Sequence, residues 1–191
     1  QHKDAVVLHI GCEMDSRVLR VGTNHHQWYD VDFSEVISER KLHYTENENY
    51  KMLCGDARNP EWLSKISKQK SAIVVVEGIS MYLKSDEVLN LVKVLNAHFD
   101  KLFLMMDCYT KLSAKISKYK NPINDVGVTT VYGTDNPKDF ETEDFKFIKE
   151  HNMTPENLVN DLEGAEKFVF KKLYGGKFSK KMYRLFEYKS V

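Results

Sequence analysis

Four acidic residues lie at the ends of four short apolar segments of the sequence: Asp15 and Asp56 follow their segments, and Asp32 and Glu77 end theirs. If these segments are parallel strands, their carboxyl ends share one edge of a sheet, where ligands of α/β proteins bind. Carboxylates gathered at one edge repel each other and lose hydration. A ligand that carries hydroxyls, amines or positive charge relieves that cost. The alternative is that each acid is only a helix cap or a loop residue.

The turn at Gly11 narrows the class of ligand. Glycine lets the backbone approach a ligand closely, and Asp32 follows at roughly the 20-residue separation at which an acid reaches a nucleotide ribose. The turn "GCEMDS" has Glu13 and Ser16 where a dinucleotide-binding fingerprint has its second and third glycines. Because the Glu13 carboxylate would also face a pyrophosphate unfavourably, a nucleoside without phosphates is the favoured ligand.

The elements that must position these residues alternate along the chain. Apolar segments at 5–10, 28–33, 50–55, 72–78 and 101–109 predict strands, and segments 34–44, 59–67 and 85–99 predict helices, with Ser34, Asn59 and Ser85 as their caps. Alternation of this kind predicts an α/β doubly wound, mostly parallel sheet with helices on both faces. Segments 144–151 and 181–190 predict two closing strands that could form an antiparallel pair, with a helical segment 155–173 between them. We expect the stretch 117–140 to be irregular.

Composition limits the other classes of function. The 191 residues carry 28 basic and 28 acidic side chains, so net charge gives no argument for nucleic acid or an anionic membrane as partner. No apolar run is long enough to span a bilayer. The three cysteines suit a reducing interior, and we expect a cytoplasmic protein with neither a disulfide nor a metal site.

Four segments carry a resemblance to a known family: "LHIGCEMDSR", "WYDVDFSEVISER", "CGDARNPEW" and "VVEGISMYL". In this order and spacing they resemble the leucine carboxyl methyltransferase family, including its bacterial branch of polyketide O-methyltransferases. The resemblance implies a Rossmann-like class I fold and S-adenosylmethionine as the cofactor. The family carries an N-terminal helical segment before its first strand, so we expect residues 1–191 to form a single methyltransferase domain that lacks it.

The resemblance also implies a role for individual positions. Gly11 and Cys12 would lie under the methionine part of the cofactor, and Asp32 would hold the ribose hydroxyls. Asp56 and Ala57 would border the adenine, and Glu77 would lie near the methionine end. The family usually has glycine where Glu13 stands, and it implies a structural role for Asp15 and Arg17.

The expected function is transfer of a methyl group to a carboxylate, or to a hydroxyl, of a small-molecule acceptor. A carboxylate is already ionised near neutral pH and needs no base, whereas a hydroxyl needs one. No histidine is assigned as a base, and a carboxylic acid is therefore the favoured acceptor. Tyr82 and Tyr109 are the predicted lining of the acceptor pocket. The alternatives are a nicotinamide-dependent oxidoreductase and a non-catalytic relative that binds the cofactor.

Overall fold

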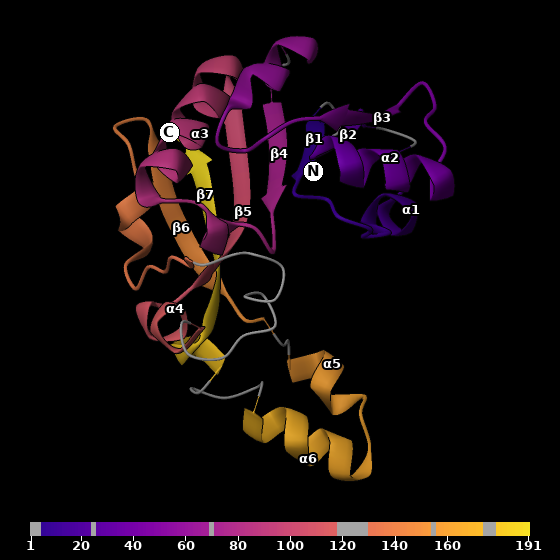
Figure 1. The fold of residues 1–191 in the computed structure, drawn as a ribbon. Helices are drawn as coiled ribbons and strands as arrows, with labels where there is room; N and C mark the ends of the chain where they lie inside the picture. Colours follow the sequence, from indigo (N-terminus) through magenta and orange to yellow (C-terminus); the bar gives the residue numbers. More distant parts are fainter. Residues whose placement is uncertain (1–4, 24–25, 69–70, 118–129, 154–155, 174–178) are drawn as a thin grey trace.

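Five parallel strands form the first part of the sheet in a computed structural model that describes residues 5–23, 26–68, 71–117, 130–153, 156–173 and 179–191 (Figure 1). They are β1 (Val6–Ile10), β2 (Trp28–Asp32), β3 (Tyr50–Cys54), β4 (Ser71–Val76) and β5 (Lys101–Tyr109). Each was predicted from its apolar run, and the parallel pairing of β1 with both β2 and β4 is confirmed. The runs of β1, β2 and β4 are mostly β-branched or aromatic, which suits strands of a sheet covered on both faces.

The two closing strands are antiparallel to their neighbours, as the sequence suggested. They are β6 (Phe145–His151) and β7 (Tyr183–Ser190), and β7 pairs with both β5 and β6. The strand order is β3-β2-β1-β4-β5-β7-β6, so the last strand in the sequence lies inside the sheet. The order reverses between β1 and β4, and the carboxyl ends of these two strands mark the place where an α/β sheet binds its ligand.

The helices differ from the prediction in several places. The described helices are α1 (Arg17–Val21), α2 (Ser34–His43), α3 (Ser85–His98), α4 (Lys111–Ser117), α5 (Glu156–Asn160) and α6 (Gly164–Leu173). Ser34 and Ser85 are the first helical residues rather than the caps. The segment 59–67 forms a 3₁₀ helix over Pro60–Lys65, and the segment 155–173 is broken into α5 and α6 before Gly164, whose φ is +56°. The sequence analysis did not foresee α1 or α4.

Successive side chains of β1 point to opposite faces of the sheet, and both faces are covered. Val6, Leu8 and Ile10 join the large core that contains the apolar face of α3, while Val7 joins a second core with residues of α1 and α2. The residues predicted for the buried face of the 85–99 helix are all buried: Val88, Leu91, Val92, Leu95 and Phe99. This arrangement confirms the doubly wound fold.

Candidate functional site

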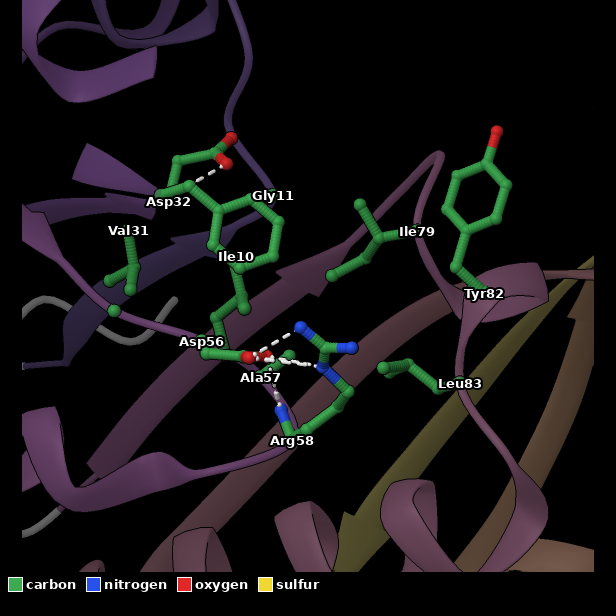
Figure 2. A pocket seen from close by; sticks show the side chains of 12 residues that line it. Ile10, Gly11, Val31, Asp32, Asp56, Ala57, Arg58, Ile79, Tyr82 and Leu83 are labelled. Carbon is green, nitrogen blue, oxygen red and sulfur yellow. Dashed lines mark hydrogen bonds and ion pairs between the residues drawn. The ribbon is translucent and has the colours of Figure 1, made fainter. Parts of the chain in front are cut away.

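A pocket of about 400 Å³ opens where the strand order reverses, at the carboxyl ends of β1, β2 and β3 (Figure 2). Most of its lining is apolar. The pocket brings together five of the residues that the sequence analysis assigned to a site: Gly11, Asp32, Asp56, Ala57 and Tyr82. The other lining residues are Ile10, Val31, Phe33, Gly55, Arg58, Ile79 and Leu83. Apolar walls with a few polar groups are typical of a pocket for a small molecule.

Gly11 forms part of the pocket lining, and its geometry permits no side chain. Its φ is +74°, and a Cβ atom placed on it would lie 2.4 Å from Cγ2 of Ile79. Any other residue would both strain the backbone and push Ile79 out of place. Glycine at position 11 therefore lets Ile79, another residue of the pocket lining, pack directly against the turn.

Asp32 ends β2 with its carboxylate fixed by the backbone. Oδ2 accepts a hydrogen bond of 2.8 Å from the amide of Glu13, and Oδ1 accepts one of 2.8 Å from the amide of Phe33. Only 8% of the residue is exposed. Each carboxylate oxygen keeps a further lone pair, so Asp32 offers an oriented acceptor to the hydroxyls of a ligand.

Glu13 has a left-handed backbone conformation, and its amide donates to Asp32. Glu13 has a φ of +44°, in the left-handed region where residues other than glycine are uncommon. The family resemblance had implied glycine at this position. The chain adopts the glycine-like conformation with a glutamate, and the amide of that glutamate holds Asp32.

Asp56 follows β3 and is paired with Arg58. The Arg58 guanidinium lies 2.7 Å from Oδ2, and hydrogen bonds from Arg58 are the main reason that the pKa of Asp56 is lowered. Both residues line the pocket. Because the pair is about a third to a half exposed and leaves the pocket open, a ligand could still reach the Asp56 carboxylate.

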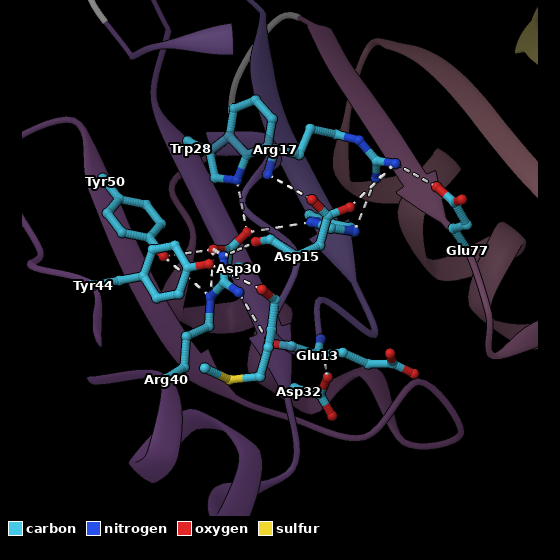
Figure 3. Close-up of polar contacts among 12 residues, drawn as sticks. Glu13, Asp15, Arg17, Trp28, Asp30, Asp32, Arg40, Tyr44, Tyr50 and Glu77 are labelled. Atoms are coloured by element: carbon cyan, nitrogen blue, oxygen red, sulfur yellow. Dashed lines mark hydrogen bonds and ion pairs between the residues drawn. The ribbon is translucent and has the colours of Figure 1, made fainter. Parts of the chain in front are cut away.

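Three of the predicted site residues lie outside this pocket. Cys12 is fully buried in the core under α1 and α2, and burial raises the pKa of its thiol. Glu77 lies at the end of β4, with 47% of its side chain exposed, and forms an ion pair with Arg17 (Figure 3). Tyr109 lines a separate pocket on the other side of the Ser80–Tyr82 turn. Their assigned roles stay predictions.

A buried polar network under the turn was not foreseen (Figure 3). Arg40 of α2 is 0% exposed and forms an ion pair with the equally buried Asp30 of β2. The guanidinium also donates to the carbonyl of Glu13 at 3.0 Å and to that of Asp15 at 2.8 Å. Arg40 thus ties the turn after β1 to the neighbouring strand.

Two further donors bind Asp30, one at the oxygen Oδ1 and one at the oxygen Oδ2 that Arg40 also contacts. Trp28 Nε1 donates to Oδ1 at 2.7 Å and the Tyr50 hydroxyl donates to Oδ2 at 2.6 Å. One signal in the sequence could have exposed the network, namely a charged residue at position 30 inside an apolar strand. Burial of such a carboxylate requires a cation and hydrogen-bond donors nearby.

The fold is the Rossmann-like sheet of class I methyltransferases, and the sequence comparisons agree with it. The chain is 29% identical over 171 residues to the tetracenomycin polyketide synthesis O-methyltransferase TcmP of Streptomyces glaucescens. This alignment covers 88% of this chain and 63% of that protein. It is 26% identical over 152 residues to the S-adenosyl-L-methionine-dependent methyltransferase dpfgK of Gibberella zeae, covering 72% of this chain and 51% of that protein. No family model matches.

A solved structure with the same fold is that of magnesium protoporphyrin IX methyltransferase from Synechocystis PCC 6803 with bound SAH. Its TM-score is 0.57 at 14% identity, and the match covers 98% of this chain and 74% of that one. The similarity to methyltransferases is therefore confirmed, while the leucine carboxyl methyltransferase branch stays a prediction. The chain spans less than two thirds of the length of either curated relative.

In the described part of the chain, no group of three or more histidine, cysteine, aspartate or glutamate residues is placed to hold a metal ion. The described helices include none with the length and apolar character needed to cross a membrane.

Proposed function

We propose that this chain is the cofactor-binding domain of an S-adenosylmethionine-dependent O-methyltransferase that acts on a small-molecule acceptor. The observation that carries the proposal is the Asp32 carboxylate, oriented by two backbone amides beside an open pocket. The similarity to TcmP and dpfgK, whose names describe methyltransferases, supports the same reaction.

The residues of the pocket fit this cofactor. Gly11 leaves room at the turn for a closely bound ligand, Asp32 would accept hydrogen bonds from the ribose hydroxyls, and Asp56 with Ala57 would border the adenine. Glu77, at the end of β4, would lie toward the amino group of the methionine part. When bound, S-adenosylmethionine supplies an electrophilic methyl group. The chain has to orient the acceptor in line with that group and exclude water.

The acceptor oxygen can be a carboxylate or a hydroxyl. The sequence favours a carboxylic acid, because a carboxylate reacts without a base. Tyr82 lines the cofactor pocket, and Tyr109 lines the neighbouring pocket. A small acceptor that reaches the methyl group would lie between them.

Two other functions remain as alternatives. A nicotinamide-dependent oxidoreductase would need room for a pyrophosphate, and Glu13 places a carboxylate at the turn where that group would bind. A non-catalytic relative would bind the cofactor without turning over.

Calorimetric titration with S-adenosylhomocysteine, S-adenosylmethionine and NAD separates these functions. We expect S-adenosylhomocysteine to bind and NAD to bind at least tenfold more weakly, and tighter binding of NAD would overturn the proposal. Radiolabelled methyl transfer to a panel of carboxylic acids and phenols then distinguishes an enzyme from a non-catalytic relative.

A further inference from the structure

Asp107, near the end of β5, is a buried carboxylate with one oxygen unused. The residue is 0% exposed. Oδ2 accepts hydrogen bonds from the Gly78 amide at 2.8 Å and from the Tyr183 hydroxyl of β7. Oδ1 has no hydrogen-bond partner among the described residues. A buried acid that lacks a cation and is only half satisfied costs stability, and such groups are common where chemistry is done.

The groups that face Asp107 make it easy to protonate. Glu77 comes from β4, Tyr183 from β7 and the Gly78 amide from the turn after β4. Burial, with a smaller contribution from the Glu77 charge, raises the pKa of Asp107 to about 6 against the opposing hydrogen bonds. Asp107 is therefore ionised near neutral pH but can take up a proton readily.

Tyr183 connects this carboxylate to a second pocket. That pocket, of about 310 Å³, is lined by Met81, Tyr109, Ser113, Ile116, Ser117, Met182 and Tyr183. No side chain in this set carries a charge. The rings of Tyr109 and Tyr183 meet edge to face with their centres 5.4 Å apart. Aromatic rings and thioethers of this kind pack well against a flat aromatic ligand.

The second pocket lies next to the proposed cofactor pocket. The short turn Ser80–Tyr82 separates them: Tyr82 lines the first and Met81 lines the second. The pKa of Tyr82 is raised mainly by burial and also by Tyr109, which lines the second pocket.

We propose that Tyr183 and Asp107 form a proton-accepting pair and that the acceptor bound beside them is an aromatic hydroxyl compound. The inference rests on the proposed methyltransferase function and chooses between its two acceptor oxygens. Because the Tyr183 hydroxyl donates its hydrogen to Asp107, only its lone pairs remain for a ligand. A hydroxyl can donate to those lone pairs, whereas a carboxylate cannot.

The proton balance follows from this hydrogen-bond chain. The acceptor O–H bond breaks and its proton goes to the Tyr183 oxygen, while the Tyr183 proton goes to Oδ2 of Asp107. The acceptor oxygen would gain the methyl group as the bond from that methyl to the sulfur of S-adenosylmethionine breaks, which leaves S-adenosylhomocysteine. Asp107 would end as a neutral acid that later releases its proton to solvent. A carboxylate acceptor would gain nothing from this pair and would meet the negative charges of Asp107 and Glu77.

The first test is binding without cofactor, with 2-naphthol and 2-naphthoate as probes that share one ring system. We expect the chain to bind 2-naphthol at least tenfold more tightly than 2-naphthoate at pH 8. Tyr183→Phe should weaken 2-naphthol binding at least tenfold and leave 2-naphthoate binding unchanged. Tyr29→Phe, which alters a hydroxyl on β2 outside both pockets, is the control. Preference for 2-naphthoate, no binding of 2-naphthol, or an unaffected Tyr183→Phe variant would each overturn the inference.

The second test is the pH profile of methyl transfer to 2-naphthol. In the wild-type chain, kcat/KM should rise about tenfold per pH unit below pH 6 and level off above it. Asp107→Asn should remove this rise and lower the plateau at least a hundredfold. If the pH profile of kcat/KM is the same in Asp107→Asn as in the wild-type chain, Asp107 does not accept the proton through Tyr183.

The two proposals can fail separately. S-adenosylhomocysteine binding, measured on the same samples, tests the methyltransferase function. The cofactor-free binding of 2-naphthol still decides the role of Tyr183 if that function fails, or if Asp107→Asn does not fold.

Discussion

Asp32 shows how much of the proposed function depends on one oriented carboxylate. Asp32→Asn replaces one acceptor oxygen with an NH₂ group, which would face the amide of either Glu13 or Phe33 as donor against donor. We expect S-adenosylhomocysteine to bind at least tenfold more weakly to this variant, measured by calorimetry. Asp100→Asn removes an exposed carboxylate in the turn before β5 and is the matched control. Equal affinity of the two variants would exclude Asp32 from the ribose site.

Asp107 gives a prediction about stability as well as chemistry. Its pKa is raised from 3.8 to about 6 in the folded chain, so folding favours the protonated form. The stability that this preference contributes is complete below about pH 4 and is lost as pH rises from there to about 6, a difference of roughly 3 kcal/mol at ~1.4 kcal/mol per pKa unit.

Asparagine cannot ionise and can still accept from Gly78 and Tyr183. Asp107→Asn should therefore be more stable than the wild-type chain by about 1–3 kcal/mol at pH 8 and close to it near pH 4. Urea unfolding at both pH values measures this difference. If Asp107→Asn is less stable than the wild-type chain at pH 8, the folded chain stabilises the ionised Asp107 carboxylate.

At the scale of elements, helix α2 stabilises the turn after β1, because its Arg40 side chain donates hydrogen bonds to backbone carbonyls of that turn. Arg40→Met would leave the Asp30 carboxylate buried without its cation and the carbonyls of Glu13 and Asp15 without a donor. We expect a loss of about 3–5 kcal/mol in the free energy of unfolding. Asp30→Asn in the same chain should recover part of that loss, since it removes the unpaired charge, while the amide oxygen can still accept from Trp28 and the NH₂ group can donate to the Tyr50 hydroxyl. No recovery would mean that the packing of the arginine, and not its charge, is what matters.

The sequence was sufficient to predict the strands and much of the pocket lining, because these pocket residues lie next to the strands in the sequence. Gly11 and Asp56 come directly after an apolar run and Asp32 ends one, so their place at the sheet edge follows from the strands themselves. Arg40 and Tyr183 could not be assigned in this way. Tyr183 meets Asp107 across 76 residues of chain, and the contact exists only because β7 pairs with β5. Helix α4 has only seven residues, too few for a clear period, and its packing against β5 decides its structure.

For the molecule as a whole, ligand binding should show as a change in thermal stability. A ligand at a hundred times its Kd stabilises the folded state by about 2.7 kcal/mol. For a chain of 191 residues, that corresponds to a rise in Tm of roughly 5–11 °C. We expect S-adenosylhomocysteine to produce such a rise in a thermal-shift measurement, and NAD at the same concentration to produce little. A Tm that does not respond to S-adenosylhomocysteine at any concentration would argue against the pocket as its site.

The position of β7 has a consequence for how this protein is made. As the chain leaves the ribosome, β5 and β6 emerge before the strand that must lie between them. A chain interrupted before Tyr183 would present the open edge of β5 to other molecules, which invites aggregation. It would also lack the tyrosine that faces Asp107, so a truncated product could carry the pocket above Gly11 and still lack its proton acceptor. Synthesis therefore has to reach β7 before the described sheet and the contact between Tyr183 and Asp107 are complete.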